Sequence, residues 1–229
     1  MQLFYLEDPK DEIILSAEES KHATKVLRKK EGDILNFTDG KGNLYKAEIT
    51  IADTRKCRLT ILSSEQKEKQ HNYHLHIAIA PTKNMDRFEW FLEKATEIGI
   101  DEITPIICSR SERKIIKKER GSRILLSAIK QSLKYHLPKL NEAVSLTNFL
   151  ERNFDGKKYI AHCENGEKKD LKTINKTEKT IILIGPEGDF SPKEIELALE
   201  NQFKAVNLAT NRLRTETAGI IAVHTINII

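Results

Sequence analysis

The chain has 229 residues, with 38 lysines and arginines against 34 aspartates and glutamates, so its formal net charge is only +4. A chain of this length can bury a sizeable core and form one large or two small domains. Net charge alone gives no argument for a nucleic-acid partner. No apolar run approaches membrane-spanning length, and the start, MQLFYLEDPKDE, does not resemble a secretory signal. We therefore expect a cytoplasmic protein.

Basic residues are concentrated in two segments, KHATKVLRKK at 21–30 and RSERKIIKKERGSR at 110–123. Clusters of this kind attract phosphate groups. A solvated helix or loop face carries the same pattern, so charge alone leaves both interpretations open.

Residues 1–62 contain short apolar runs broken by turns. The sequence DGKGN supplies turn chemistry for a β-hairpin. These features favour a small β-barrel-like domain, and the polar segment 63–72 is predicted to be a linker. The expected elements are strands at 13–16, 34–49 and 57–62 and a basic helix at 18–30.

From residue 73 onward the pattern alternates between strands and helices, which favours an α/β fold with a mostly parallel sheet flanked by helices. Ser191, Pro192 and Glu194 form a capping box with proline in the first turn. The expected strands are 75–80, 102–108, 158–163, 180–184 and 205–209, and the expected helices are 86–98, one ending near 137–138, 147–153, 192–202 and one from about 216.

Two loops near the C-terminus each follow a strand and precede a helix, where α/β folds usually bind ligands. The first is GPEGDF at 185–190, in which Gly185 and Gly188 allow close backbone approach and conformations closed to other residues. It lacks both GxxxxGK[ST] and GxGxxG, so neither a P-loop nor a standard dinucleotide site is indicated. An ordinary strand–turn–helix junction is the alternative for this loop alone.

The second loop places Arg212 and Arg214 beside Thr215, Glu216 and Thr217 at an expected helix N-terminus. A threonine hydroxyl can cap such a helix. Capping does not explain two arginines and a glutamate in the same turn. Arginines here suit a polyanion or a developing negative charge.

Together these loops resemble the SPOUT class of RNA methyltransferases, and more closely the RsmE family, which methylates N3 of a uridine in 16S ribosomal RNA. The family's GPEGGF corresponds to GPEGDF at 185–190, and its LGxxILRTETA corresponds to LATNRLRTETA at 208–218. Further motifs match in order over nearly the whole chain: HATKVLR at 22–28, Gly32–Asp33, FTDGKGNLY at 37–45, Lys83, Asp86–Arg87, KATEIG at 94–99, SRSER at 109–113 and QS at 131–132.

The chain departs from this family at three places. Asp189 replaces the second glycine of GPEGG and adds a charge near the expected methyl donor, and Ala209 replaces the glycine of LG. Both changes are expected to be tolerated where the family binds its cofactor through backbone groups. An arginine that the family often carries near its N-terminus is missing, so its RNA contact is not carried over.

The resemblance implies a small PUA-like β-barrel domain that binds RNA, over residues 1–70, and a SPOUT methyltransferase domain over residues 73–229. It further implies that the second domain ends in a trefoil knot, and that the protein forms a homodimer with the C-terminal helix at the interface.

The resemblance implies S-adenosyl-L-methionine as the cofactor, enclosed by loops at 183–188 and 208–213. The residues expected to bind it are Leu183, Gly185, Pro186, Glu187, Gly188, Leu208, Ala209, Leu213, Thr215 and Thr217.

Transfer to uridine N3 requires that the imide lose its proton, through a base or with a cation that stabilises the anion. We expect Arg214 to stabilise the anion and Glu187 or Glu216 to act as the base. Glu216 could equally form a structural ion pair with Arg214.

The implied partner is 16S rRNA of the small ribosomal subunit, with phosphates held by side chains of both domains across a cleft. Such contacts position RNA without reading its sequence. The candidates are Lys21, His22, Arg28 and Lys29 on the first domain, and Lys83, Arg110, Arg113, Gln131 and Lys134 on the second.

Two alternative functions are compatible with parts of this evidence. A SPOUT enzyme could methylate another position, such as a ribose 2′-oxygen, and a non-catalytic RNA-binding or ribosome assembly factor could retain the fold. Asp189 and Ala209 leave the second reading open.

No metal site is expected. The three cysteines, Cys57, Cys108 and Cys163, lie far apart without CxxC spacing. His71, His74 and His76 gather near the start of a strand, but no cysteine or glutamate completes a ligand set. Within the sequence HCE at 162–164, Cys163 at a strand end is attributed to packing.

Overall fold

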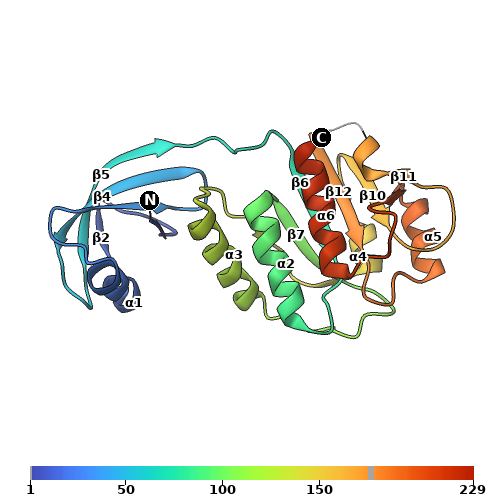
Figure 1. Ribbon diagram of the computed structural model, residues 1–229, viewed down its shortest axis with the longest axis horizontal. Coiled ribbons are helices and arrows are strands. Elements are labelled where there is room, and N and C mark those ends of the chain that lie inside the picture. Colours follow the sequence, from blue (N-terminus) through green and yellow to red (C-terminus); the bar gives the residue numbers. More distant parts are fainter. Residues whose placement is uncertain (1, 175–177) are drawn as a thin grey trace. The chain divides into compact units, whose positions relative to one another are not determined.

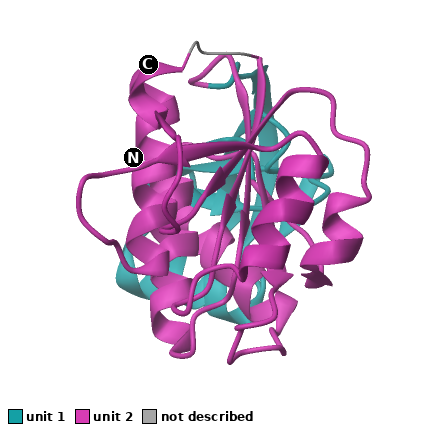
Figure 2. Cartoon of the chain, turned by 90° about the vertical axis from the view of Figure 1, so that its right-hand side faces the viewer, with its two compact units in different colours: residues 1–69, 129–137 teal, residues 70–128, 138–229 magenta. Residues whose placement is uncertain are grey.

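The computed structural model describes residues 2–174 and 178–229, and these form two compact units (Figures 1 and 2). The first unit comprises the residues up to Lys69 together with Ile129–Leu137, and the second comprises Gln70–Ala128 and Pro138–Ile229. The sequence pattern did not indicate that the segment Ile129–Leu137 belongs with the first unit.

The first unit is built on a five-stranded sheet of order β1-β3-β4-β5-β2, in which β1 pairs with β3 in parallel and the other pairs are antiparallel. Its core includes Phe4, Phe37 and Leu59. The small β domain expected from the sequence is confirmed. The strands are β1 (Leu3–Tyr5), β2 (Glu12–Ile14), β3 (Ile34–Thr38), β4 (Asn43–Ile51) and β5 (Arg58–Gln66).

The basic helix expected at 18–30 is shorter than predicted. It consists of α1 (Ala17–Lys21) and a π-helical turn, η1 (His22–Val26). Arg28 adopts a left-handed conformation with φ 55°, and the Lys29 amide donates to the carbonyl of Ala23 at 3.0 Å. This geometry ends a helix, so Arg28 and Lys29 lie beyond it.

The prediction of a linker from residue 63 was wrong for its first four residues. β5 continues to Gln66 because Ser63–Gln66 pair with β4. Backbone hydrogen bonding holds this part of the strand although its side chains show no apolar periodicity.

The helix expected to end near residue 137 ends earlier. α3 covers Lys118–Ser132, and Leu133 follows with φ 55°. The chain beyond it pairs with the β3–β4 turn: the Tyr135 carbonyl accepts from the Gly42 amide at 2.9 Å, and the Leu137 amide donates to the Gly40 carbonyl at 2.8 Å. These bonds hold the end of this segment within the first unit.

The second unit contains an eight-stranded sheet, and every strand pair in it is parallel. The order is β11-β13-β10-β12-β6-β7-β8, with β9 also paired to β7. The predicted parallel α/β architecture is confirmed. The strands are β6 (His74–Ile79), β7 (Glu102–Ile107), β8 (Lys139–Leu140), β9 (Val144–Ser145), β10 (Lys157–Ala161), β11 (Lys169–Asp170), β12 (Lys179–Ile184) and β13 (Lys204–Asn207).

Helices lie on both sides of this sheet (Figure 2). α2 (Met85–Ile98) packs against α6 (Thr215–Ile228), and α6 packs on β6 and β12. α4 (Leu146–Leu150) contacts α5 (Pro192–Glu200), and the turn η2 (Leu171–Thr173) contacts α6. None of the helices in the described ranges is both long and apolar enough to cross a membrane.

The start of α5 agrees with its sequence signature. The Ser191 hydroxyl accepts the Glu194 amide at 3.3 Å, and the Glu194 carboxylate accepts the Ser191 amide at 2.8 Å. The predicted capping box is therefore confirmed. Because the same carboxylate also accepts the Ser109 amide at 2.7 Å, it ties the end of β7 to α5.

α6 approaches α2 and β6 closely at one glycine. A Cβ atom on Gly219 would lie 2.6 Å from the ring of Phe91 and 2.9 Å from Cδ1 of Ile79. Both neighbours are buried, so neither can move aside freely. Gly219 sets the spacing between α6 and the rest of the core.

We expect Gly219→Ala to lower the free energy of unfolding by about 1–3 kcal/mol, because overpacking outweighs the helix propensity that alanine adds. Thermal and urea unfolding of the variant would measure this loss. Ser127→Ala, on an exposed face of α3, is the matched control and should change stability by less than about 0.5 kcal/mol. Equal or greater stability of Gly219→Ala would contradict the close contact.

Candidate active site

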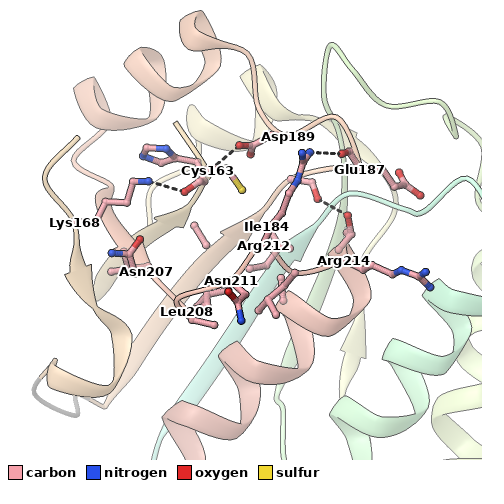
Figure 3. A pocket seen from close by; sticks show the side chains of 18 of the residues that line it. Cys163, Lys168, Ile184, Glu187, Asp189, Asn207, Leu208, Asn211, Arg212 and Arg214 are labelled. Atoms are coloured by element: carbon pink, nitrogen blue, oxygen red, sulfur yellow. Dashed lines mark hydrogen bonds between the residues drawn. The ribbon is translucent and has the colours of Figure 1, made fainter. Parts of the chain in front are cut away.

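A cavity of about 570 Å³ lies where β10, β12 and β13 end (Figure 3). These strands are neighbours and parallel, so the loops that follow them meet at one edge of the sheet. The cavity is lined by Ala161–Cys163 and Lys168 after β10, by Ile184–Glu187 and Asp189 after β12, and by Val206–Thr215 and Ala218 after β13.

Most of the residues expected to bind the cofactor line this cavity, namely Gly185, Pro186, Glu187, Leu208, Ala209, Leu213 and Thr215. Leu183, Gly188 and Thr217 do not. Leu183 is fully buried in the core with Phe190, and Thr217 lines a neighbouring hollow. The structure thus brings together the two loops that the sequence motifs singled out.

Thr215 joins these two loops directly. Its hydroxyl donates to the Gly185 carbonyl at 3.1 Å, and its side chain is buried. Arg212 also donates to the carbonyl of Glu187 at 3.3 Å. A threonine cap was considered for α6, but the N-cap residue is Arg214 and it makes no side-chain capping bond. The threonine hydroxyl is engaged by the glycine loop instead.

The two glycines of GPEGDF do not play the conformational role expected of them, because neither has a positive φ. A Cβ on Gly185 would meet the ring of Phe190 at 3.1 Å, and one on Gly188 would meet Cβ of Arg110 at 3.3 Å. Glycine is therefore favoured here by packing of the loop on its own neighbours.

The left-handed residue of the loop is Asp189, with φ 61°. This conformation accounts for a glycine at the same place in the motif GPEGG, and aspartate is among the residues that tolerate it best. The Asp189 carboxylate accepts the Cys163 amide at 2.7 Å and the Phe190 amide at 2.8 Å. The charge expected here lies at the cavity wall and ties the β10 loop to the β12 loop.

Sequence reasoning missed the residues that β10 contributes. Cys163 was attributed to packing, yet it is exposed and lines the cavity beside His162 and Lys168. Burial and the nearby Asp189 raise the pKa of the Cys163 thiol. Placing β10 next to β12 and β13 in the predicted sheet would have revealed these residues, because neighbouring parallel strands end at one edge.

Two carboxylates were candidates for the base, and their surroundings differ. The Glu187 carboxylate is exposed and its Oε1 accepts the Lys83 amide at 2.8 Å. Glu216 is 7% exposed, its Oε1 lies 3.8 Å from Nε of Arg87, and its buried Oε2 has no hydrogen-bond partner among the described residues. The alternative pairing of Glu216 with Arg214 does not occur, since its ionic partner is Arg87.

Arg214 is the N-cap residue of α6, and its side chain is exposed. Figure 3 shows this side chain directed away from Cys163 and Asn207, on the opposite wall of the cavity. No described residue forms a hydrogen bond or an ion pair with its guanidinium. Arg214 is thus a cation at the cavity rim available for a ligand.

The basic candidates of the second unit are mostly engaged within it. Lys83 forms an ion pair with Glu112 at 2.8 Å, and Arg113 donates to the Lys83 carbonyl at 3.2 Å. Arg110 donates to the carbonyls of Gly188 and Phe190 at 2.8 and 3.2 Å. Arg110 therefore supports the glycine loop from outside the cavity.

The remaining basic candidates belong to the first unit. Lys21 and Arg28 are exposed, and His22 and Lys29 are half-buried. Gln131 and Lys134 had been assigned to the second domain, but they lie in the segment Ile129–Leu137 of the first unit.

Two of the three histidines near β6 have hydrogen-bond partners, and Nε2 of His74 lies 3.9 Å from Oε2 of Glu102. His71 contacts the Asp101 carboxylate at 3.1 Å and stacks on Tyr73, and His76 contacts the Thr104 hydroxyl at 2.7 Å. No group of three or more potential ligands that could hold a metal ion is found among the described residues. Burial lowers the pKa of His76 to about 4.

We expect stability to fall as pH drops from about 6.5 towards 4, because the unfolded state then takes up a proton that folded His76 does not. His76→Gln should reduce the loss of unfolding free energy between pH 7 and pH 5 by about 2 kcal/mol. Urea denaturation at both pH values measures this. His224→Gln, on the exposed side of α6, is the control. Parallel pH dependence in His76→Gln and the parent chain would refute the prediction.

Thr215→Val should lower the free energy of unfolding by about 1–2 kcal/mol, because it removes the buried hydrogen bond to Gly185 while keeping the side chain's shape. Thr215→Ser retains the hydroxyl and should lose less. Denaturant unfolding of both variants compares them. The loops would not depend on this bond if the valine variant were as stable as the serine variant.

Two family models match the chain: an RNA methyltransferase domain over residues 69–227 and an RNA methyltransferase PUA domain over residues 15–62. Ribosomal RNA small subunit methyltransferase E of Rickettsia conorii is 30% identical over 217 residues, covering 92% of this chain and 87% of the relative.

Two crystal structures are similar over nearly the whole chain. A "probable rRNA-methyltransferase" from Porphyromonas gingivalis is 39% identical with a TM-score of 0.92, covering 97% of this chain and 95% of that one. Ribosomal RNA small subunit methyltransferase E from Neisseria gonorrhoeae, bound to S-adenosyl methionine, is 25% identical with a TM-score of 0.87 and the same coverage. The chain therefore belongs to the ribosomal RNA small subunit methyltransferase E family of RNA methyltransferases.

Proposed function

We propose that this protein methylates N3 of a uridine in 16S ribosomal RNA of the small ribosomal subunit. Its family establishes the broader activity, that of an RNA methyltransferase dependent on S-adenosyl-L-methionine. The observation that carries the proposal is the direct bond between the GPEGDF and LRTETAG loops at one cavity, through Thr215 and Gly185. Both loops carry the motifs that resemble the uridine-N3 enzymes.

The cavity fits S-adenosyl-L-methionine. Its volume of about 570 Å³ lies within the range of cofactor sites. Ile184, Leu208 and Leu213 give it apolar walls suited to an adenine ring, and His162 Nδ1 is buried without a hydrogen-bond partner among the described residues. The residues proposed to hold the cofactor are the sequence-predicted residues that line the cavity, together with His162, Asn207 and Asn211.

When bound, the cofactor supplies a methyl group already activated by the sulfonium. The protein must then orient the uridine and manage the N3 proton. We assign the base role to Glu216 rather than Glu187, because Oε2 of Glu216 has no partner whereas Oε1 of Glu187 accepts the Lys83 amide. Glu216 would take the N3 proton, and the imide would carry the resulting negative charge.

Arg214 would stabilise that charge. Its guanidinium is unpaired among the described residues and stands at the N-terminus of α6, where the helix dipole adds positive potential. Glu216 lies two residues further along the same turn. One helix end thus supplies both the proton acceptor and the stabilising cation.

The RNA would be held by basic side chains of both units, with Lys21, Arg28 and Lys29 exposed or half-buried on the first. The resemblance also supports a homodimer and a C-terminal trefoil knot. α6 fits the dimer because Ile228 is exposed and Ile220 and Ile221 are only half-buried. The proposal includes a cytoplasmic location, where a ribosomal substrate would be found.

The proposal is tested by methyl transfer from labelled S-adenosyl-L-methionine to small ribosomal subunits from cells that lack this enzyme. The RNA is digested and its nucleosides are identified by mass spectrometry. Formation of 3-methyluridine is the expected result. A 2′-O-methylated nucleoside would show that the enzyme methylates a ribose 2′-oxygen instead. Absence of both methyl transfer and donor binding would favour a non-catalytic factor.

Arg214→Ala should lower kcat by about a hundred-fold or more, as loss of a charge-stabilising group does at other active sites. The affinity of the variant for S-adenosyl-L-methionine should change little, since the Arg214 side chain points away from Cys163 and Asn207 in Figure 3. Single-turnover kinetics and calorimetric titration separate the two effects. Lys204→Ala, exposed on β13, is the control. Full turnover by Arg214→Ala would remove this residue from the mechanism.

A further inference from the structure

A second hollow, of about 630 Å³, lies between the first turns of α2 and α6. It shares residues 212–214 with the cavity described above, so that segment separates the two. α2 contributes Asp86, Arg87 and Trp90, and α6 contributes Glu216 and Thr217. All these residues belong to the second unit. A molecule in this hollow would lie next to whatever fills the cavity.

Trp90 is the only tryptophan in the chain, and it is 44% exposed. Its neighbours on α2, Phe88 and Phe91, are buried in the core, whereas Trp90 lies at the hollow. No other aromatic ring in the described part of the chain stacks on it. Exposed aromatic faces of this kind stack on unpaired RNA bases.

The environment of Glu216 indicates which chemical groups a ligand should have. Its side chain is more than nine-tenths buried, and its Oε2 lacks a hydrogen-bond partner among the described residues. A buried carboxylate oxygen without a donor is costly. A ligand that offers an N–H group in this hollow would satisfy it.

Two arginines flank this acceptor. Nε of Arg87 lies 3.8 Å from Oε1 of Glu216, and Arg214 precedes Glu216 by two residues. The three side chains together supply two donor groups, the guanidinium groups, and one acceptor group, the carboxylate. The pairing edge of uracil offers the complement, two carbonyl oxygens on either side of an N–H. Cytosine has no proton at N3 and would direct a lone pair at the carboxylate.

We propose that this hollow binds the target uracil, with its face stacked on Trp90 and its N3–H donated to Oε2 of Glu216. The inference rests on the proposed function and extends it, because it assigns the base a site and names the residues that select it. Three arginines against two carboxylates leave the hollow with a positive charge, which suits the phosphates that accompany an RNA base.

The fluorescence of Trp90 tests this directly, because the full chain contains no other tryptophan. Single-stranded oligouridylate and oligocytidylate of equal length are titrated into the protein without methyl donor. We expect saturable quenching by oligouridylate, and binding of oligocytidylate weaker by about ten-fold, the size of one lost base-edge contact.

Variants then separate stacking from general electrostatic attraction. In anisotropy measurements with labelled oligouridylate, Trp90→Leu should weaken binding by about ten-fold, while Trp90→Phe, which keeps a ring face, should retain most of it. Leu199→Ala, at a similarly exposed position on α5, is the matched control. Glu216→Gln should reduce the preference for uridine, because its amide can donate to N3 of cytosine.

Three outcomes would overturn the inference: no quenching of Trp90, equal binding by Trp90→Leu and Leu199→Ala, or an emission spectrum that shifts with protein concentration and not with RNA. The last would mean that a second copy of the chain covers the hollow. The proposed function is judged separately by 3-methyluridine formation. Methylation without Trp90 quenching would leave the function standing and remove this base site.

Discussion

The arrangement of the site depends on one buried hydrogen bond, from the hydroxyl of Thr215 to the carbonyl of Gly185. It fixes the first turn of α6 against the loop that follows β12. Arg214 and Glu216 flank Thr215 along the chain, so the backbone positions of both proposed functional residues follow from this bond. The side-chain contact also replaces the usual cap of α6, which leaves the amides of its first turn without a side-chain partner from the N-cap residue.

Close packing fixes the next turn of α6. Gly219 lies one turn beyond Thr215, where a Cβ would come within 2.6 Å of Phe91. α6 therefore lies against both α2 and β6, and the distance between α2 and α6 sets the width of the hollow between their first turns. A helix packed closely at two successive turns has little freedom to rotate, which holds the buried carboxylate of Glu216 in place.

Much of the fold could be predicted because its signals are local. The buried face of α2, the capping box at Ser191 and the apolar strands of the parallel sheet each follow from residues near one another in the chain. Features that depend on distant partners could not. β5 extends through polar Ser63–Gln66 because β4 pairs with it, and the segment Ile129–Leu137 joins the first unit through backbone bonds to the β3–β4 turn.

The same distinction between local and distant signals applies to the candidate site. Its two motif loops were predictable from composition and spacing, but the contribution of β10 required the strand order, and the partner of Glu216 required the position of Arg87 on α2. Asp189 is the instructive residue. As a departure from GPEGG it suggested only an added charge near the methyl donor. Its left-handed backbone and the hydrogen bond that it accepts from the Cys163 amide show that it stabilises the loop.

The position of residues 212–214 between two hollows has a mechanistic consequence. A methyl group and its acceptor must meet within bonding distance, so donor and base have to occupy spaces that share a boundary. Arg212, Leu213 and Arg214 form that boundary here, and they precede the turn that carries Glu216. The side chain of Leu213 is apolar and half-buried, while Arg214 places a cation beside it. In the proposed reaction, charge develops on the imide next to this positive group, so the electrostatic stabilisation acts where the charge forms.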